Sequence, residues 1–186
     1  MWSIDFILLK GGDSMKKWKI SFALLCIPLL LFFVFLFFFP YKQVIAFTYE
    51  DQAQLLAYLS LEKDKTFQIQ YTHSIHLSDV IESYRISDEE IIQTELAYED
   101  FAVGMPSNAE GDEVFEEIAG TYYIKNMNRS FPFFDLRIGQ VRANHRLIYQ
   151  NNTFTLSHYL KPGIWVRISP KKITLWQQLK GVNMNG

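Results

Sequence analysis

A histidine and two glutamates stand at spacings that would align them on neighbouring β-strands: His73, Glu82 and Glu95. If Leu77-Ser78 form a tight turn, residues whose numbers sum to 155 pair with each other, so His73 lies opposite Glu82. A second turn through Asp88-Glu89 pairs residues whose numbers sum to 177 and places Glu95 opposite Glu82. Opposed side chains in a sheet lie about 5 Å apart at Cβ. The pattern therefore predicts one row of three side chains.

Such a row would have several chemical uses. Two carboxylates on an apolar face repel each other and lose hydration, so one takes up a proton or both share a cation. Protonated His73 would be that cation, or the three side chains would bind a divalent metal ion. A divalent metal is the one cofactor that we consider for this row. We expect a ligand-binding site at His73, Glu82 and Glu95 and assign no catalytic residue. A ligand-free polar network inside the sheet and a small hydrolase or metal-dependent enzyme are the alternatives.

The remaining candidates have weaker patterns. His76 falls on the face opposite to His73 by strand alternation, so the two make a poor metal pair. Ser74 lacks the glycines of a nucleophile elbow. His145 and His158 lie near predicted loops and are expected to be surface or packing histidines.

The row depends on β-strands, and most of the chain after residue 46 has strand character. Residues 67–75 alternate apolar or aromatic with polar side chains, which is the period of a half-buried strand. Short strands at this spacing predict an all-β fold, a single β-sandwich or barrel-like domain of antiparallel strands. Further predicted strands cover 53–61, 80–86, 91–98, 121–125, 134–141, 146–150, 153–157, 164–168 and 173–176, with turns at 151–152, 161–163 and 169–171.

Charge is divided between two halves of this β region. Residues 47–117 contain seventeen acids and three bases, whereas residues 118–186 contain one acid and ten bases. No linker rich in Pro, Gly or Ser separates the halves, so we expect one domain at 41–186 in which acidic and basic strands interleave. The basic residues stand singly along the strands, and we expect no nucleic-acid partner.

An apolar block precedes the β region. Residues 20–39 contain no charged side chain and only Ser21 as a polar one. As a helix they would span about 30 Å, the thickness of the hydrocarbon core of a bilayer. Lys16, Lys17 and Lys19 precede the block, so the positive-inside rule places the remainder outside the cytoplasm. The block predicts one N-terminal transmembrane helix, a signal-anchor within residues 15–40 of a single-pass protein of the cytoplasmic membrane.

Two features near the N-terminus leave alternatives. Val44-Ile45-Ala46 has small residues where signal peptidase requires them, so secretion after cleavage near Ala46 is the alternative localisation. Residues 1–14 are interpreted as a mis-assigned start before Met15 or as a short cytoplasmic tail. The one cysteine, Cys26, excludes an intrachain disulfide.

Several short motifs resemble a known domain. They are Tyr71-Thr72-His73-Ser74, Glu82, Glu95, the run 101–106 and His145-Arg146-Leu147. Residues 67–147 resemble a DUF1850-type uncharacterised bacterial domain, found in proteins encoded beside, or fused to, TRAP transporter permeases of the TAXI type. The resemblance implies an extracytoplasmic binding or accessory module with a role in solute uptake, a permease or solute receptor as partner, and no established activity. A purely structural partner of a membrane permease is a further alternative. Gly104 and Pro106 are expected to form a structural turn.

Overall fold

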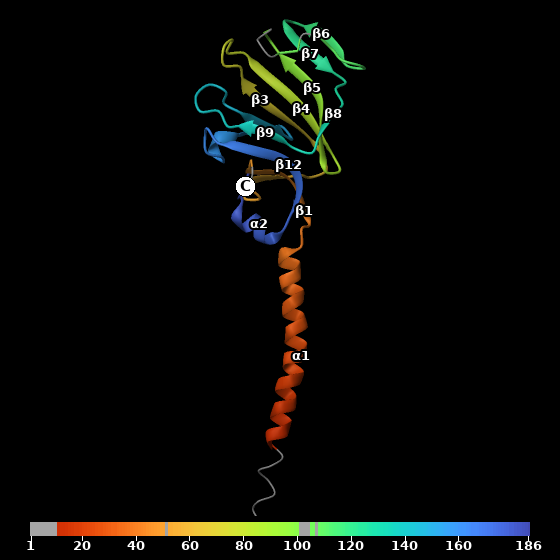
Figure 1. The fold of residues 1–186 in the computed structure, drawn as a ribbon, viewed down its shortest axis with the longest axis vertical. Coiled ribbons are helices and arrows are strands. Elements are labelled where there is room, and N and C mark those ends of the chain that lie inside the picture. The colour runs from red at the N-terminus through yellow and green to blue at the C-terminus, as the bar shows by residue number, and fades with distance from the viewer. Residues whose placement is uncertain (1–10, 51, 101–104, 107) are drawn as a thin grey trace, which may run out of the picture.

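A long helix followed by a β domain makes up the chain (Figure 1). The computed structural model describes residues 11–50, 52–100, 105–106 and 108–186. The predicted turn residue Gly104 and residues 1–10 lie outside these ranges. The elements are α1 (Gly11–Phe38), β1 (Lys42–Tyr49), β2 (Leu55–Ser60), β3 (Thr66–Thr72), β4 (Asp79–Ser87), β5 (Glu90–Tyr98), β6 (Val114–Ile118), β7 (Thr121–Lys125), β8 (Arg129–Phe131), β9 (Phe134–Arg137), β10 (Arg146–Tyr149), β11 (Asn152–Thr155), η1 (Leu156–His158), β12 (Trp165–Ile173), α2 (Leu175–Lys180) and β13 (Val182–Asn183).

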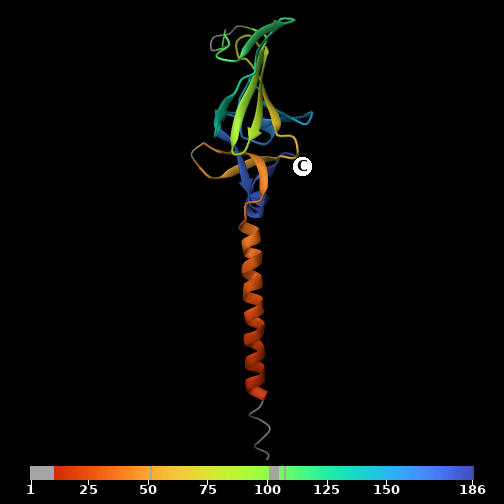
Figure 2. The ribbon, with the colours of Figure 1, turned by 90° about the vertical axis from the view of Figure 1, so that its right-hand side faces the viewer.

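The described strands form two sheets, which confirms the all-β prediction. The small sheet has the order β13-β2-β1-β12-β9 and lies beside the end of α1 (Figures 1 and 2). The large sheet has the order β11-β10-β3-β4-β5-β7-β6, and β8 pairs with β5. Strands from the basic half are interleaved with strands from the acidic half: β10 pairs with β3, and β7 and β8 pair with β5.

One core joins the two sheets. Phe47 and Leu59 from the small sheet pack in the same buried cluster as Ile69 and Tyr84 from the large sheet. A second cluster around Tyr98 and its neighbours Val80, Leu96, Ile124 and Met127 fills the half of the large sheet that is farther from α1. In the small sheet, Ile45 and Phe47 of β1 face this shared core, and Val44 and Ala46 on the opposite face pack in a third cluster with Tyr58 and Ile173.

Strand β1 occupies the centre of the small sheet, between β2 and β12. Val44, Ile45 and Ala46 are fully buried there. No strand is predicted at this position from the sequence, because the segment follows the apolar block and its small residues match a signal-peptidase site. Its strand is instead specified by partners on both sides, since Ile45 pairs with Leu59 of β2 and with the distant Pro170 of β12.

Two predicted boundaries near the C-terminus are wrong. The turn expected at 169–171 is the middle of β12, where Pro170 continues the strand. Pairing between β12 and β9 ends at Ile168, so β12 has no ladder on that side at Pro170 and the missing N–H is tolerated. The strand expected at 173–176 ends at Ile173, and helix α2 follows because Thr174 and Gln177 form a reciprocal capping box.

Helix α1 is 28 residues long, about 42 Å at the usual rise. Its apolar side chains are spread around the helix, and those described between Phe22 and Phe38 are exposed except for the half-buried Cys26 and Phe37. Pro28 lies within it. When the described residues alone are considered, neither helix is long and apolar enough to cross a membrane.

Candidate functional site

Glu82 lies on the inner face of the large sheet, between Ile69 of β3 and Leu96 of β5. The hydroxyl of Tyr84 donates a hydrogen bond to Glu82 Oε2 at 2.6 Å, and the hydroxyl of Tyr71 also hydrogen-bonds the carboxylate. Burial raises the pKa of Glu82, and the two tyrosine hydrogen bonds lower it by less. The fold therefore favours the protonated form of this acid more than water does.

The two tyrosines stay protonated donors. Burial, followed by the charge of Glu82, raises the pKa of Tyr71 to about 12. The same causes raise the pKa of Tyr84 further. Tyr84 is fixed between two stacked rings, those of Phe67 and Phe134, with centroids 5.2 and 5.1 Å away. The hydroxyl groups that surround Glu82 are thus held by the packed core.

His145 extends this group of side chains to the edge of the sheet. It immediately precedes β10, and its ring centroid lies 5.6 Å from that of Tyr71. Its Nδ1 accepts a hydrogen bond from the backbone N–H of Gly139 at 3.1 Å, and burial lowers its pKa. A neutral imidazole with Nδ1 as acceptor fits both observations. We call Glu82, Tyr71, Tyr84 and His145 the Glu82 cluster.

His73 is not opposite Glu82. The β3–β4 pairing ends at Thr72 with Asp79, and the connection is a six-residue loop over residues 73–78 instead of the tight turn predicted at Leu77-Ser78. The backbone of His73 closes this loop by donating to Ser78 O at 2.8 Å and accepting from Leu77 N at 3.0 Å. The pairing is shifted by four residues, so Ile69 stands where His73 was expected.

The loop also changes the relation between His73 and His76. Strand alternation would place them on opposite faces, but neither residue is in a strand. Their ring centroids are 5.7 Å apart. In the described part of the chain, no three His, Cys, Asp or Glu side chains come together as metal ligands.

Glu95 lies on the outer face of the large sheet, on the side away from Glu82. The predicted sum of 177 holds from Ser87–Glu90 to Tyr84–Gln93. A β-bulge at Thr94 then adds one residue, so Ser83 pairs with Glu95 and Glu82 with Leu96. One extra residue reverses the facing of every later side chain. The predicted row of His73, Glu82 and Glu95 is therefore not formed, and neither is the metal site that it would have provided.

A second polar cluster joins β3, β4 and β10 on the outer face. Asp79 accepts hydrogen bonds from Gln70 Nε2 at 2.6 Å, from Thr72 Oγ1 at 3.1 Å and from Arg146 Nη2 at 3.2 and 3.3 Å. Sequence reasoning did not select Asp79 or Arg146. The His145-Arg146-Leu147 motif was the feature of the sequence that could have indicated Arg146. Its contact with Asp79 depends on the pairing of Arg146 with Gln70, which the sequence does not show.

Two loops meet at the end of β3 that points away from α1 (Figure 1). Arg142 Nη1 donates to Ser74 O at 3.2 Å, and Thr72 N donates to Ala143 O at 2.8 Å. Ile75, Leu77 and Val141 expose large apolar side chains on these loops. Leu77 has φ 61°, a left-handed conformation that is uncommon for a bulky residue. We call loops 73–78 and 139–144 the distal loops.

Pro106, the described half of the predicted turn, lies in the segment after β5. The hydroxyl of Tyr98 donates to its carbonyl oxygen, and Met105 packs against the buried cluster around Tyr98. The segment is thus tied to the core of the large sheet.

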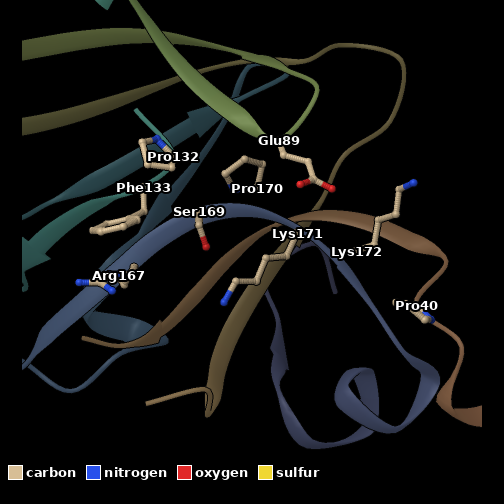
Figure 3. A pocket seen from close by; sticks show the side chains of 9 residues that line it. All are labelled: Pro40, Glu89, Pro132, Phe133, Arg167, Ser169, Pro170, Lys171 and Lys172. Atoms are coloured by element: carbon tan, nitrogen blue, oxygen red, sulfur yellow. The ribbon is translucent and has the colours of Figure 1, made fainter. Parts of the chain in front are cut away.

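An open groove at the opposite end of the domain lies close to α1, and Figure 3 shows its lining side chains. Lys171 and Lys172 share it with Glu89, so its charges are mixed. Arg167 is already engaged there, because it forms two 2.8 Å hydrogen bonds with Asp135 and lies 3.7 Å from the centroid of the Phe133 ring.

The geometry defines an all-β domain with a half-buried carboxylate on its inner face and two exposed loops on the side away from α1. A domain of unknown function (DUF1850) is found at residues 67–156, which confirms the family part of the resemblance. No curated protein and no solved structure matches the chain. The matched residues run from the second residue of β3 through β11, so they contain the large sheet except Thr66, together with β9. The other strands of the small sheet come from the segments on either side.

Proposed function

We propose that this chain is a membrane-tethered extracytoplasmic module that acts as an accessory of a solute-uptake transporter. The observation that carries the proposal is the position of β1. This strand begins four residues after α1 ends and forms the buried centre of the small sheet. Cleavage near Ala46 would remove Val44 and Ile45 from that centre, which supports a retained tether over a released domain.

The apolar surface of α1 supports the same proposal. Its exposed leucines and phenylalanines do not contribute to the core of the β domain, and a surface of this kind is stable in contact with lipid or another protein. The proposal rests on the complete block 20–39, which includes Ile20, Ser21 and Ala23, whose side chains the structure does not describe. The lysines that precede the block favour an extracytoplasmic β domain.

The transport role rests on the resemblance and on the distal loops. TRAP transporters of the TAXI type are the systems that the resemblance implies. The distal loops expose Ile75, Leu77 and Val141 beside Arg142, at the end of the domain away from α1. Apolar side chains next to a cation suit a protein partner with an acidic rim. We propose a TAXI-type solute receptor or its permease as that partner.

The hydrolase and metal-enzyme alternatives lose their geometric basis. Both required His73, Glu82 and Glu95 to be neighbours, and the β-pairing separates them. Glu82 is instead hydrogen-bonded by Tyr71 and Tyr84, which suits a buried polar network inside the sheet.

Membrane attachment is tested by expressing the full chain with a C-terminal tag in a bacterium. We expect the tag to stay with membranes after alkaline extraction and to be digested by protease added to spheroplasts. A soluble product that begins at Phe47 would contradict the tether, and a protease-protected tag would contradict the orientation.

The transport role is tested by co-expressing the chain with the permease and solute receptor of a TAXI-type TRAP system from the same genome. We expect co-purification in mild detergent that Leu77→Glu weakens at least tenfold. Ile118→Glu, on exposed strand β6, is the matched control and should leave co-purification unchanged. Equal effects of both variants, or no co-purification by the unmodified chain, would contradict the role.

A further inference from the structure

Helix α2 packs beside the end of α1. The Trp176 ring centroid lies 5.9 Å from that of Phe37 and 6.3 Å from that of Phe38. Gln178 Nε2 donates to the Tyr41 hydroxyl at 3.0 Å. Figures 1 and 2 show α2 below the small sheet, on the side from which α1 leaves the domain. A C-terminal helix is thus attached to the N-terminal tether.

The apolar side chains of α2 do not enter the core. None of its six residues is buried. Leu179 is 70% exposed, Trp176 41% and Leu175 39%. The capping box of Thr174 and Gln177 and the backbone bond from Gly181 N to Gln177 O fix this short helix without core packing. A helix that keeps Trp and Leu on its surface beside α1 has an unsatisfied apolar face.

Cations border this face. Lys180 Nζ lies 4.2 Å from the centroid of the Trp176 ring, and Lys42 Nζ, at the start of β1, lies 5.6 Å from that of Tyr58. Among the described residues, neither lysine forms an ion pair. The described residues that line the groove beside α2 include no acid; they are Ala53, Gln54, Leu55, Trp176, Gln177 and Lys180. Asp88 and Glu89 line a different groove, together with Lys171 and Lys172.

We propose that α2 is a second membrane contact, which lies on the bilayer surface beside α1 and binds anionic phospholipid headgroups. Trp176 and Leu179 enter the boundary between headgroups and acyl chains, and Lys180 and Lys42 contact the phosphates. Trp and Lys are the residues that anchor proteins at this depth, and an amphipathic helix with a basic border lies in this plane. The inference rests on the proposed membrane tether.

Docking of α2 would determine how the domain stands on the membrane. With α1 alone as tether, the domain would turn about residues 39–41. With α2 held at the surface, the small sheet faces the bilayer and the distal loops point away from it. The proposed partner surface would then be presented at a constant height.

The test uses the full chain in lipid nanodiscs. In a Cys26→Ser background, Leu179→Cys is labelled with an environment-sensitive fluorophore, and Ile118→Cys on β6 is the matched distal control. Both positions are exposed, so labelling leaves the core intact. We expect lipids spin-labelled near the headgroup to quench the label at 179 at least twofold and the label at 118 by less than a tenth.

Lipid composition and charge variants identify the ligand. Quenching at 179 should be stronger in discs that contain phosphatidylglycerol than in discs of phosphatidylcholine alone. It should fall at least twofold in Lys42→Glu/Lys180→Glu and be retained in Lys42→Arg/Lys180→Arg. Equal quenching in both kinds of disc would overturn the proposal that α2 binds anionic headgroups. If the label is protected in a way that depends on protein concentration, a second copy of the chain covers α2, and the proposed contact with the bilayer is overturned.

A separate label on native Cys26 reports on the tether. If Cys26 is quenched by deep spin labels while position 179 is not quenched, the docking of α2 is overturned and the tether stands. If Cys26 itself is not quenched, the proposed tether fails, and the docking that rests on it fails as well.

Discussion

Replacing Glu82 by glutamine should change how folding stability depends on pH. Glu82 lies between Ile69 and Leu96 on the inner face of the sheet and is hydrogen-bonded by the neutral donors Tyr84 and Tyr71. Because its pKa is raised in the fold, the folded chain binds this proton more tightly than the unfolded chain does. The resulting stabilisation is complete below the ordinary glutamate pKa and is lost as pH rises through the raised pKa.

The size of the effect follows from the cost of a partly buried charge. Each unit of pKa difference between folded and unfolded chain corresponds to about 1.4 kcal/mol. Incomplete satisfaction of a buried polar group costs about 1–3 kcal/mol. Glutamine has the same shape, accepts from one tyrosine and donates to the oxygen of the other, but does not ionise. We therefore expect the free energy of unfolding of Glu82→Gln, relative to that of the unmodified chain, to rise by on the order of 1–3 kcal/mol as the pH is raised from 4 to 8.

Urea unfolding of the full chain in detergent, followed by near-ultraviolet circular dichroism at pH 4, 5, 6, 7 and 8, measures this difference. Glu95→Gln removes a carboxylate from the outer face of the neighbouring strand and is the control. The reasoning is refuted if the curves of stability against pH for Glu82→Gln and the unmodified chain run parallel. If Glu95→Gln changes the pH dependence of stability as much as Glu82→Gln does, the assignment of this pH dependence to Glu82 is refuted.

Three further changes test other parts of the structure. Tyr84→Phe removes the hydroxyl that donates the 2.6 Å hydrogen bond to Glu82. It should lower the free energy of unfolding, measured in urea, by about 1.5–3 kcal/mol at pH 8 and by less at pH 4. Equal losses of stability at both pH values would contradict a hydrogen bond to the ionised acid. Asp79→Ala and Arg146→Ala should show a coupling energy of about 0.5–1 kcal/mol in a double-mutant cycle, because Asp79 is 38% exposed at its side chain; zero coupling would contradict the outer-face cluster. A chain of residues 47–186 should lose cooperative unfolding, since it lacks Val44, Ile45 and Ala46 of the central strand; a cooperative transition in calorimetry would contradict the role of β1.

Alternation along β4 predicted the facing of Glu82 correctly although its partner was wrong. A shift of four residues preserves facing, because side chains alternate with a period of two. Glu82 therefore remains on the inner face, with Tyr71 beside it, even though His73 does not reach it. The shift of one residue at Thr94 has the opposite effect and moves Glu95 to the outer face.

The errors occur where backbone geometry, not residue type, determines the structure. Leu77 takes a left-handed conformation in a six-residue loop, and nothing in its side chain indicates this. The bulge at Thr94 is stabilised by contacts from other segments, since Thr94 Oγ1 donates to Ser83 O at 3.1 Å and Thr94 O accepts from Met127 N at 3.1 Å.

The sequence by itself determined the class of structure: an apolar N-terminal block, an all-β region and two halves of opposite charge. These features follow from hydrophobicity, alternation and charge, which each segment carries in its own residues. Only the tertiary structure decided which side chains meet. Glu82 meets Tyr84 and Tyr71, Asp79 meets Arg146, and Trp176 meets Phe37, because register, bulges and long-range pairing depend on contacts between segments that are far apart in the chain.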